Sequence, residues 1–124
     1  GTMAQQQVAE NRIIQMFQQM KSECNQLSSK ISELELEKNE HELVLGTIKE
    51  LEPSRKCFRM VGGVLVERNV GEVAPAVERN KKGIESVIES LSKQLHEKEK
   101  ELADFVTKYK IRQVPAGAEN RVMG

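Results

Sequence analysis

Apolar residues recur at alternating steps of four and three along the first half of the chain. This heptad pattern predicts one long helix with a coiled-coil seam, because the a and d positions of successive heptads face a partner helix. Pro53 ends the pattern, since proline cannot continue a helix and pushes the preceding residue to an extended conformation. The predicted seam comprises Ile13, Phe17, Met20, Cys24, Leu27, Ile31, Leu34, Lys38, His41, Leu45 and Ile48.

The last third of the chain carries a second heptad pattern of similar length. Asn69 and Glu72 have the spacing of a helix N-cap and its capping-box partner. Pro75 lies near the first turn, where proline costs least, and a kink there remains an alternative. The second predicted seam comprises Val77, Ile84, Ile88, Leu91, Leu95, Leu102, Phe105 and Tyr109, with Lys81 and Lys98 at polar positions.

Residues 55–68, between these helices, alternate as a β-hairpin does. Gly62-Gly63 supplies two residues that tolerate positive φ, which a two-residue hairpin turn requires. An isolated two-stranded ribbon is marginal in water, so we expect strands of other chains to pair with this one. The opposed pairs are then Val61 with Val64, Met60 with Leu65, and Arg59 with Val66. The predicted oligomerisation residues are Phe58, Met60, Val61, Gly62, Gly63, Val64, Leu65 and Val66.

Two arms of equal length around a tight connector predict a mainly α fold, an antiparallel coiled-coil hairpin. Pairing about the Gly-Gly turn brings together Leu34 with Leu91, Met20 with Phe105, and Phe17 with Tyr109. Leu36, Leu43 and Val44 lie outside the seam and indicate more than one neighbour near the hairpin.

The predicted organisation has three parts. Residues 1–4 are expected to be a cloning remnant or a disordered N-terminus. Residues 5–112 form the domain, with a helix at about 5–52, the hairpin at about 55–68 and a helix at about 70–110. Residues 113–124 are expected to be a flexible tail, because they contain Pro115 and two glycines.

Composition supports coiled coil over a globular core, since charged residues make up 31% and aromatic residues 3% of the chain. The net charge of +0 gives no basic excess for nucleic acid or an anionic membrane. The sequence contains no transmembrane span and no signal peptide, so we expect a cytoplasmic protein. Cys24 and Cys57 are expected to be reduced and packed.

The residues form no catalytic constellation, and we predict neither an enzyme nor a cofactor or metal site. His41 and His96 lack a second ligand at metal spacing, so both are interpreted as coiled-coil residues. Gly62-Gly63 lacks the following Gly-Lys-Ser/Thr of a phosphate loop. The glutamates between residues 33 and 42 are interpreted as a solvated face.

Four apolar residues cluster at the free ends of the two predicted arms. Ordinary seam packing explains them, but a soft surface that binds apolar segments of other proteins is an alternative, as methionine-rich surfaces can do this. These candidate client-binding residues are Met16, Phe17, Met20 and Phe105.

The hairpin block R-K-C-F-R-M-V-G-G-V-L-V-E-R at 55–68, Asn39-Glu40-His41, and Val73-Ala74-Pro75-Ala76 resemble the β class of the prefoldin family. The resemblance covers roughly residues 13–112. It implies a heterohexamer of two α-class and four β-class subunits, whose hairpins build an intersubunit β-barrel. It also implies ATP-independent capture of unfolded chains such as actin and tubulin, with delivery to the cytosolic chaperonin.

A structural coiled-coil adaptor or tether that binds one folded partner is the alternative function. The hairpin favours the co-chaperone, because an adaptor needs only a tight loop between its helices.

Overall fold

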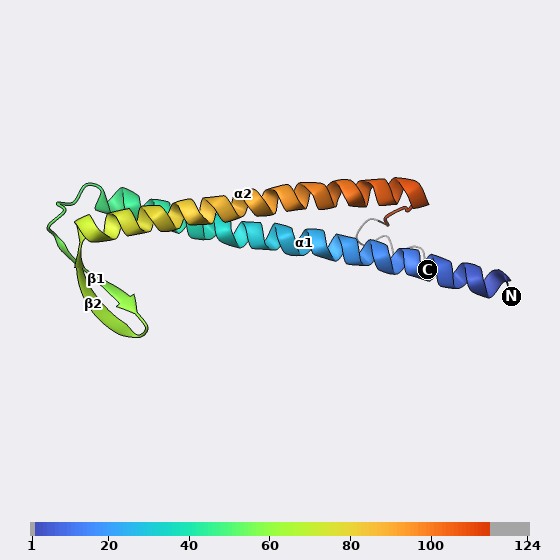
Figure 1. Ribbon diagram of the computed structural model, residues 1–124, viewed down its shortest axis with the longest axis horizontal. Helices are drawn as coiled ribbons and strands as arrows, with labels where there is room; N and C mark the ends of the chain where they lie inside the picture. Colours follow the sequence, from blue (N-terminus) through green and yellow to red (C-terminus); the bar gives the residue numbers. More distant parts are fainter. Residues whose placement is uncertain (1, 115–124) are drawn as a thin grey trace. The chain divides into compact units, whose positions relative to one another are not determined.

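The computed structural model describes residues 2–114, in which two long helices are connected through one β-hairpin (Figure 1). The elements are α1 (Thr2–Ile48), β1 (Lys56–Val61), β2 (Val64–Asn69) and α2 (Val70–Tyr109). The predicted fold class, two long helices joined by one hairpin, is therefore confirmed.

The chain forms two compact units. The hairpin unit is residues 27–94, and the terminal unit is the described part of residues 1–26 and 95–124. In each unit a stretch of α1 lies against an antiparallel stretch of α2 (Figure 1).

Heptad spacing located the seam of α1 correctly. All eleven predicted positions are buried or half-buried, and Cys24 and Leu45 are only 8% and 4% exposed. The predicted positions of α2 are also half-buried, including Lys81 and Lys98, with one exception. Tyr109 is 40% exposed, because it is the last residue of α2 and the chain turns away after it.

The helix boundaries differ from the predicted ones at two places. α1 already begins at Thr2, which corrects the expectation of disorder for residues 2–4, since the Ala- and Gln-rich start favours helix. α1 ends at Ile48, ahead of the predicted 52, where the Leu51 amide bonds the Ile48 carbonyl at 3.0 Å and tightens the turn. Most of the predicted tail, residues 115–124, lies outside the described residues.

The hairpin has the predicted turn and register. Gly62 and Gly63 have φ values of 55° and 79°, as a type I′ turn requires. Val61 pairs with Val64 and Met60 with Leu65, and the pairing continues to Lys56 and Asn69 at the base.

β2 passes into α2 without a loop. The Asn69 side chain accepts a hydrogen bond from the Glu72 amide at 2.9 Å and donates one to the Glu72 carboxylate at 3.1 Å, which confirms the predicted N-cap. The amides of Val70 and Gly71 donate to the carbonyls of Arg55 and Pro53. These bonds join the first turn of α2 to the segment before β1.

A left-handed residue ends α2. Lys110 has a φ of 53°, the Ile111 amide donates to the Val106 carbonyl at 3.0 Å, and the Lys110 amide donates to the Thr107 carbonyl at 3.4 Å. This is the Schellman arrangement, which reverses the chain direction at a helix end. After the reversal, Gln113 accepts a hydrogen bond from Lys21 of α1 at 3.4 Å.

Candidate functional site

The hairpin presents apolar side chains to solvent on both faces. Phe58, Met60 and Leu65 share one face and are 62%, 65% and 60% exposed. Val61 and Val64, next to the turn on the other face, are 52% and 62% exposed. Contiguous exposed apolar surface of this kind marks an interaction site in a soluble protein.

The base of the hairpin is better covered than its tip. Cys57 and Val66 are half-buried on the face that carries Val61 and Val64. Lys56 and Glu67 form a cross-strand ion pair at 3.3 Å on the opposite face. The apolar surface is therefore concentrated toward Gly62-Gly63, away from the helices.

Both strand edges of the hairpin are also open. Within residues 2–114 the sheet has two strands, so each strand has a partner on one side only. An unpaired edge beside apolar side chains is a template for another strand. The predicted oligomerisation residues are thus spread over both faces of the hairpin, and all of them except Val66 are exposed.

The four predicted client-binding residues all lie in the terminal unit, but they are not equally accessible. Met16 is 54% exposed, whereas Phe17, Met20 and Phe105 are half-buried at seam positions. Phe105 also packs on Tyr109, with ring centroids 4.7 Å apart. Met16 is therefore the member of the set that a ligand reaches without opening the seam.

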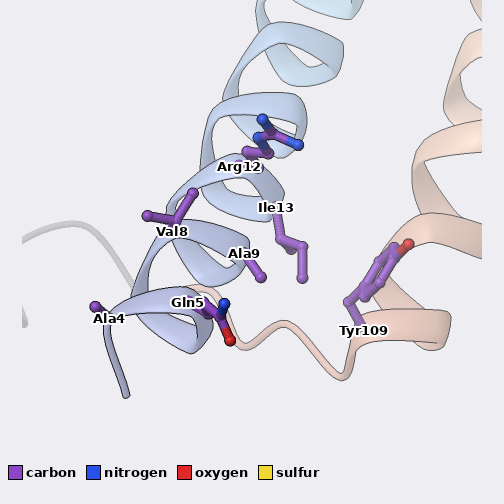
Figure 2. Close-up of a pocket in the computed structure, with 7 residues that line it drawn as sticks. All are labelled: Ala4, Gln5, Val8, Ala9, Arg12, Ile13 and Tyr109. Carbon is purple, nitrogen blue, oxygen red and sulfur yellow. The ribbon is translucent and has the colours of Figure 1, made fainter. Parts of the chain in front are cut away.

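Two hollows lie along α1 in the terminal unit. The first, of about 620 Å³, is bounded by the start of α1 and by Tyr109 of α2 (Figure 2). The second, of about 470 Å³, lies farther along α1. The first is lined by Ala4, Gln5, Val8, Ala9, Arg12, Ile13 and Tyr109. The second is lined by Arg12, Gln15, Met16, Gln19 and Met20.

Of the residues that line these two hollows, sequence reasoning identified Met16 and Met20 as candidate binding residues but not those of the first hollow. Ala9 and Met16 lie beside the seam residues Ile13 and Met20, and these four positions together follow steps of four, three and four. That spacing was the available signal. The signal is weak, because one of these four positions holds the small residue alanine.

A polar bridge joins the two helices within the terminal unit. Lys98 of α2 donates to the Glu23 carboxylate at 2.7 Å, and Gln19 donates to the other carboxylate oxygen at 3.1 Å. Hydrogen bonds from Lys98 and Gln19 lower the pKa of Glu23, and the bond to Glu23 raises the pKa of Lys98. Burial raises the pKa of the neighbouring Cys24 thiol, which favours its protonated form.

The hairpin unit has polar residues at its seam as well. Lys81 lies 3.6 Å from Glu42 of α1 and 3.7 Å from Glu85 of α2. Lys38 bonds Glu35 at 3.0 Å, and this hydrogen bond raises the pKa of Lys38. The predicted acidic face thus takes part in ion pairs, one of which crosses between the helices.

No group of three or more metal-binding side chains occurs among residues 2–114. His41 bonds the Glu37 carbonyl at 2.7 Å within its own helix, in keeping with its interpretation as a coiled-coil residue. Cys24 and Cys57 are free thiols. Within the described chain, neither helix is both long and apolar enough to cross a membrane.

Comparison with known proteins gives a consistent result. The family model described as prefoldin subunit matches residues 11–116. A Dictyostelium discoideum protein named probable prefoldin subunit 2 is 51% identical over 86% of this chain and 92% of its own length. The human protein named prefoldin subunit 2 is 49% identical over 91% of this chain and 77% of its own length.

Solved structures agree with the sequence relatives. The prefoldin beta subunit from Thermococcus strain KS-1 has the same fold, with a TM-score of 0.73 at 13% identity over 84% of this chain and 93% of its own. The beta2 subunit from the same strain has a TM-score of 0.64 at 28% identity, over 72% and 95% of the two chains. With its single hairpin between two heptad-patterned helices, the chain belongs to the prefoldin subunit family.

Proposed function

We propose that this chain is a β-class subunit of a prefoldin co-chaperone, in which its hairpin pairs with the hairpins of other subunits. The carrying observation is the hairpin surface, where Phe58, Met60 and Leu65 are each at least 60% exposed beside two open strand edges. A coiled coil that worked alone would gain nothing from this surface and would risk aggregation. Pairing with further strands removes both the free edges and the exposed apolar groups.

The proposed assembly is a heterohexamer of two α-class and four β-class subunits in the cytoplasm. Its function is the ATP-independent capture of unfolded polypeptides, such as nascent actin and tubulin, and their delivery to the cytosolic chaperonin. Support for capture comes from the terminal unit, where two hollows and the exposed Met16 offer an adaptable apolar surface.

Native mass spectrometry of the chain, with and without α-class and β-class partner subunits, tests the assembly. We expect a six-subunit complex that contains this chain, of 14.0 kDa, and that does not form from this chain alone. A stable homodimer that ignores those partners would contradict the proposal and favour a self-associating adaptor.

An aggregation assay tests the activity. The assembled complex should suppress aggregation of several unrelated denatured proteins without ATP, and replacing Met16, Phe17 and Met20 by serine should weaken this effect. Leu43→Ser is the matched control, because Leu43 is 73% exposed but lies in the hairpin unit. An adaptor would leave the denatured proteins to aggregate and would bind one folded partner at fixed stoichiometry.

A further inference from the structure

The two hollows of the terminal unit have one charged lining residue in common. Arg12 lines both, and the remaining lining residues are alanine, valine, isoleucine, methionine, tyrosine and glutamine. Its neighbours one turn away on α1 are Val8 and Ala9 in the first hollow and Gln15 and Met16 in the second. The guanidinium of Arg12 is therefore common to two hollows whose other lining residues are uncharged, and Figure 2 shows it beside the first of them.

This guanidinium is available to a ligand. Arg12 is exposed, and no ion pair within residues 2–114 involves it. A second positive charge lies close to the first hollow, where the Lys108 ammonium is 5.3 Å from the centre of the Tyr109 ring. The lining of both hollows contains no aspartate or glutamate.

The chemistry of arginine selects the ligand. A guanidinium stays charged at all physiological pH values and presents a planar fork of donors that matches a carboxylate. Glutamine amides at residues 5, 15 and 19 add uncharged donors and acceptors on the same surface. The apolar residues favour apolar side chains of a ligand, so the complementary ligand is apolar and carries a carboxylate.

From these features we infer that the α1 surface lined by Ala4 to Met20 selects apolar polypeptide segments that carry an aspartate or glutamate side chain, which pairs with Arg12. The inference rests on the proposed function and names the class of unfolded segment that this site prefers. The surface extends over sixteen residue steps of helix, about 24 Å at 1.5 Å per residue. An extended segment of about seven residues has that length.

Three fluorescent peptides of about ten residues test this selection. They share the same apolar residues and differ only in two central positions, which are aspartate, asparagine or lysine. Their termini are acetylated and amidated, so that no terminal carboxylate competes. Affinities are measured by fluorescence anisotropy against the assembled complex that contains the full chain.

We expect the aspartate peptide to bind about fivefold more tightly than the lysine peptide, in the range of an exposed charge pair. Arg12→Glu should reverse that order, and high salt should reduce the difference. Arg79→Glu is the matched control, because Arg79 is an exposed arginine of the hairpin unit, and it should leave the order unchanged. Helical circular dichroism checks that both variants fold.

The outcomes separate this inference from the function on which it rests. Equal affinity for the three peptides, or a preference that Arg12→Glu does not alter, overturns the selection for carboxylates and leaves apolar capture intact. Failure of all three peptides to bind, together with failure to suppress aggregation, overturns capture itself.

Discussion

The seam and the hairpin are both rich in apolar residues, but the chain covers only one of them. Leu45 in the seam is 4% exposed, whereas Leu65 in the hairpin is 60% exposed. The seam finds its partner in the same polypeptide, because α1 and α2 carry matching heptads. The hairpin has no such partner within residues 2–114. Folding of this chain therefore buries the seam and leaves the apolar side chains and strand edges of the hairpin exposed.

The largest effect is expected from a charged residue on the exposed apolar face of the hairpin. Leu65→Asp should abolish assembly with partner subunits, because a carboxylate would be buried without a partner in any interface that covers this face. Native mass spectrometry measures the loss of the complex. Ile14→Asp is the control, since Ile14 is an exposed aliphatic residue, at 52%, on the part of α1 that lies in the terminal unit. Equal loss in both variants would show that exposure alone, and not the hairpin, decides assembly.

A substitution in the seam should reduce the stability of the chain more than its assembly with partner subunits. Leu45→Ala should lower the free energy of unfolding by about 2–4 kcal/mol, since it removes buried methyl groups and leaves a cavity. Leu43→Ala, two residues away and 73% exposed, should change it by less than about 0.5 kcal/mol. Urea unfolding followed by circular dichroism measures both. Similar values for the two variants would mean that Leu45 is not a seam residue.

A substitution in the Gly62-Gly63 turn should have a smaller effect, on the stability of the assembled complex. Gly62→Val should destabilise the assembled complex by about 1–2 kcal/mol, because a β-branched residue is strained at a φ of 55°. Gly62→Asn should be nearly neutral, since asparagine tolerates this conformation in type I′ turns. Thermal unfolding of the complex compares them. A valine variant as stable as the asparagine variant would argue against a type I′ turn.

The polar bridge of the terminal unit gives the smallest effect and depends on pH. The pKa of Glu23 is lowered in the folded chain, so its stabilisation is present above the ordinary value of 4.5 and is lost as pH falls through the folded value. The pKa of Lys98 is raised, so its share is present below 10.5 and is lost as pH rises through its folded value.

Glu23→Gln should therefore lower Tm slightly at pH 7. The difference in Tm between this variant and the unmodified chain should become smaller below pH 4. Differential scanning calorimetry across this pH range provides the measurement. Glu33→Gln is the control, because Glu33 pairs with Lys30 on its own exposed helix face. A gap that stays constant down to pH 3 would rule out a contribution from the Glu23 charge.

The features that depend on local pattern were predictable from the sequence. Heptad spacing located the seam, and two glycines fixed the turn and therefore the register, since each pairing follows from the one before it. These predictions needed no knowledge of how α1 and α2 are joined. Asn69 and Glu72 marked the start of α2 for the same reason.

The pairing between helices was predicted less well. A symmetric fold about Gly62-Gly63 places Glu42 opposite Gly83 and Glu23 opposite Leu102, but the observed partners are Lys81 and Lys98. The connector is the physical reason. Residues 49–55 separate α1 from β1, whereas β2 passes into α2 directly. Each residue of α2 therefore lies opposite a residue of α1 that is nearer the N-terminus than a symmetric fold would place there. In the same direction, Tyr109 shares a hollow with Ile13, which lies four residues before Phe17 on α1.

The loop-free junction between Asn69 and Val70 has a mechanical consequence. A flexible linker would let a strand pair swivel about its helix, but here such a swivel must break the backbone bonds from Val70 to Arg55 and from Gly71 to Pro53. These two bonds therefore hold the hairpin in a fixed orientation at the N-terminal end of α2. In the proposed assembly, the angle between the hairpin and α2 therefore fixes the direction in which partner strands add to it.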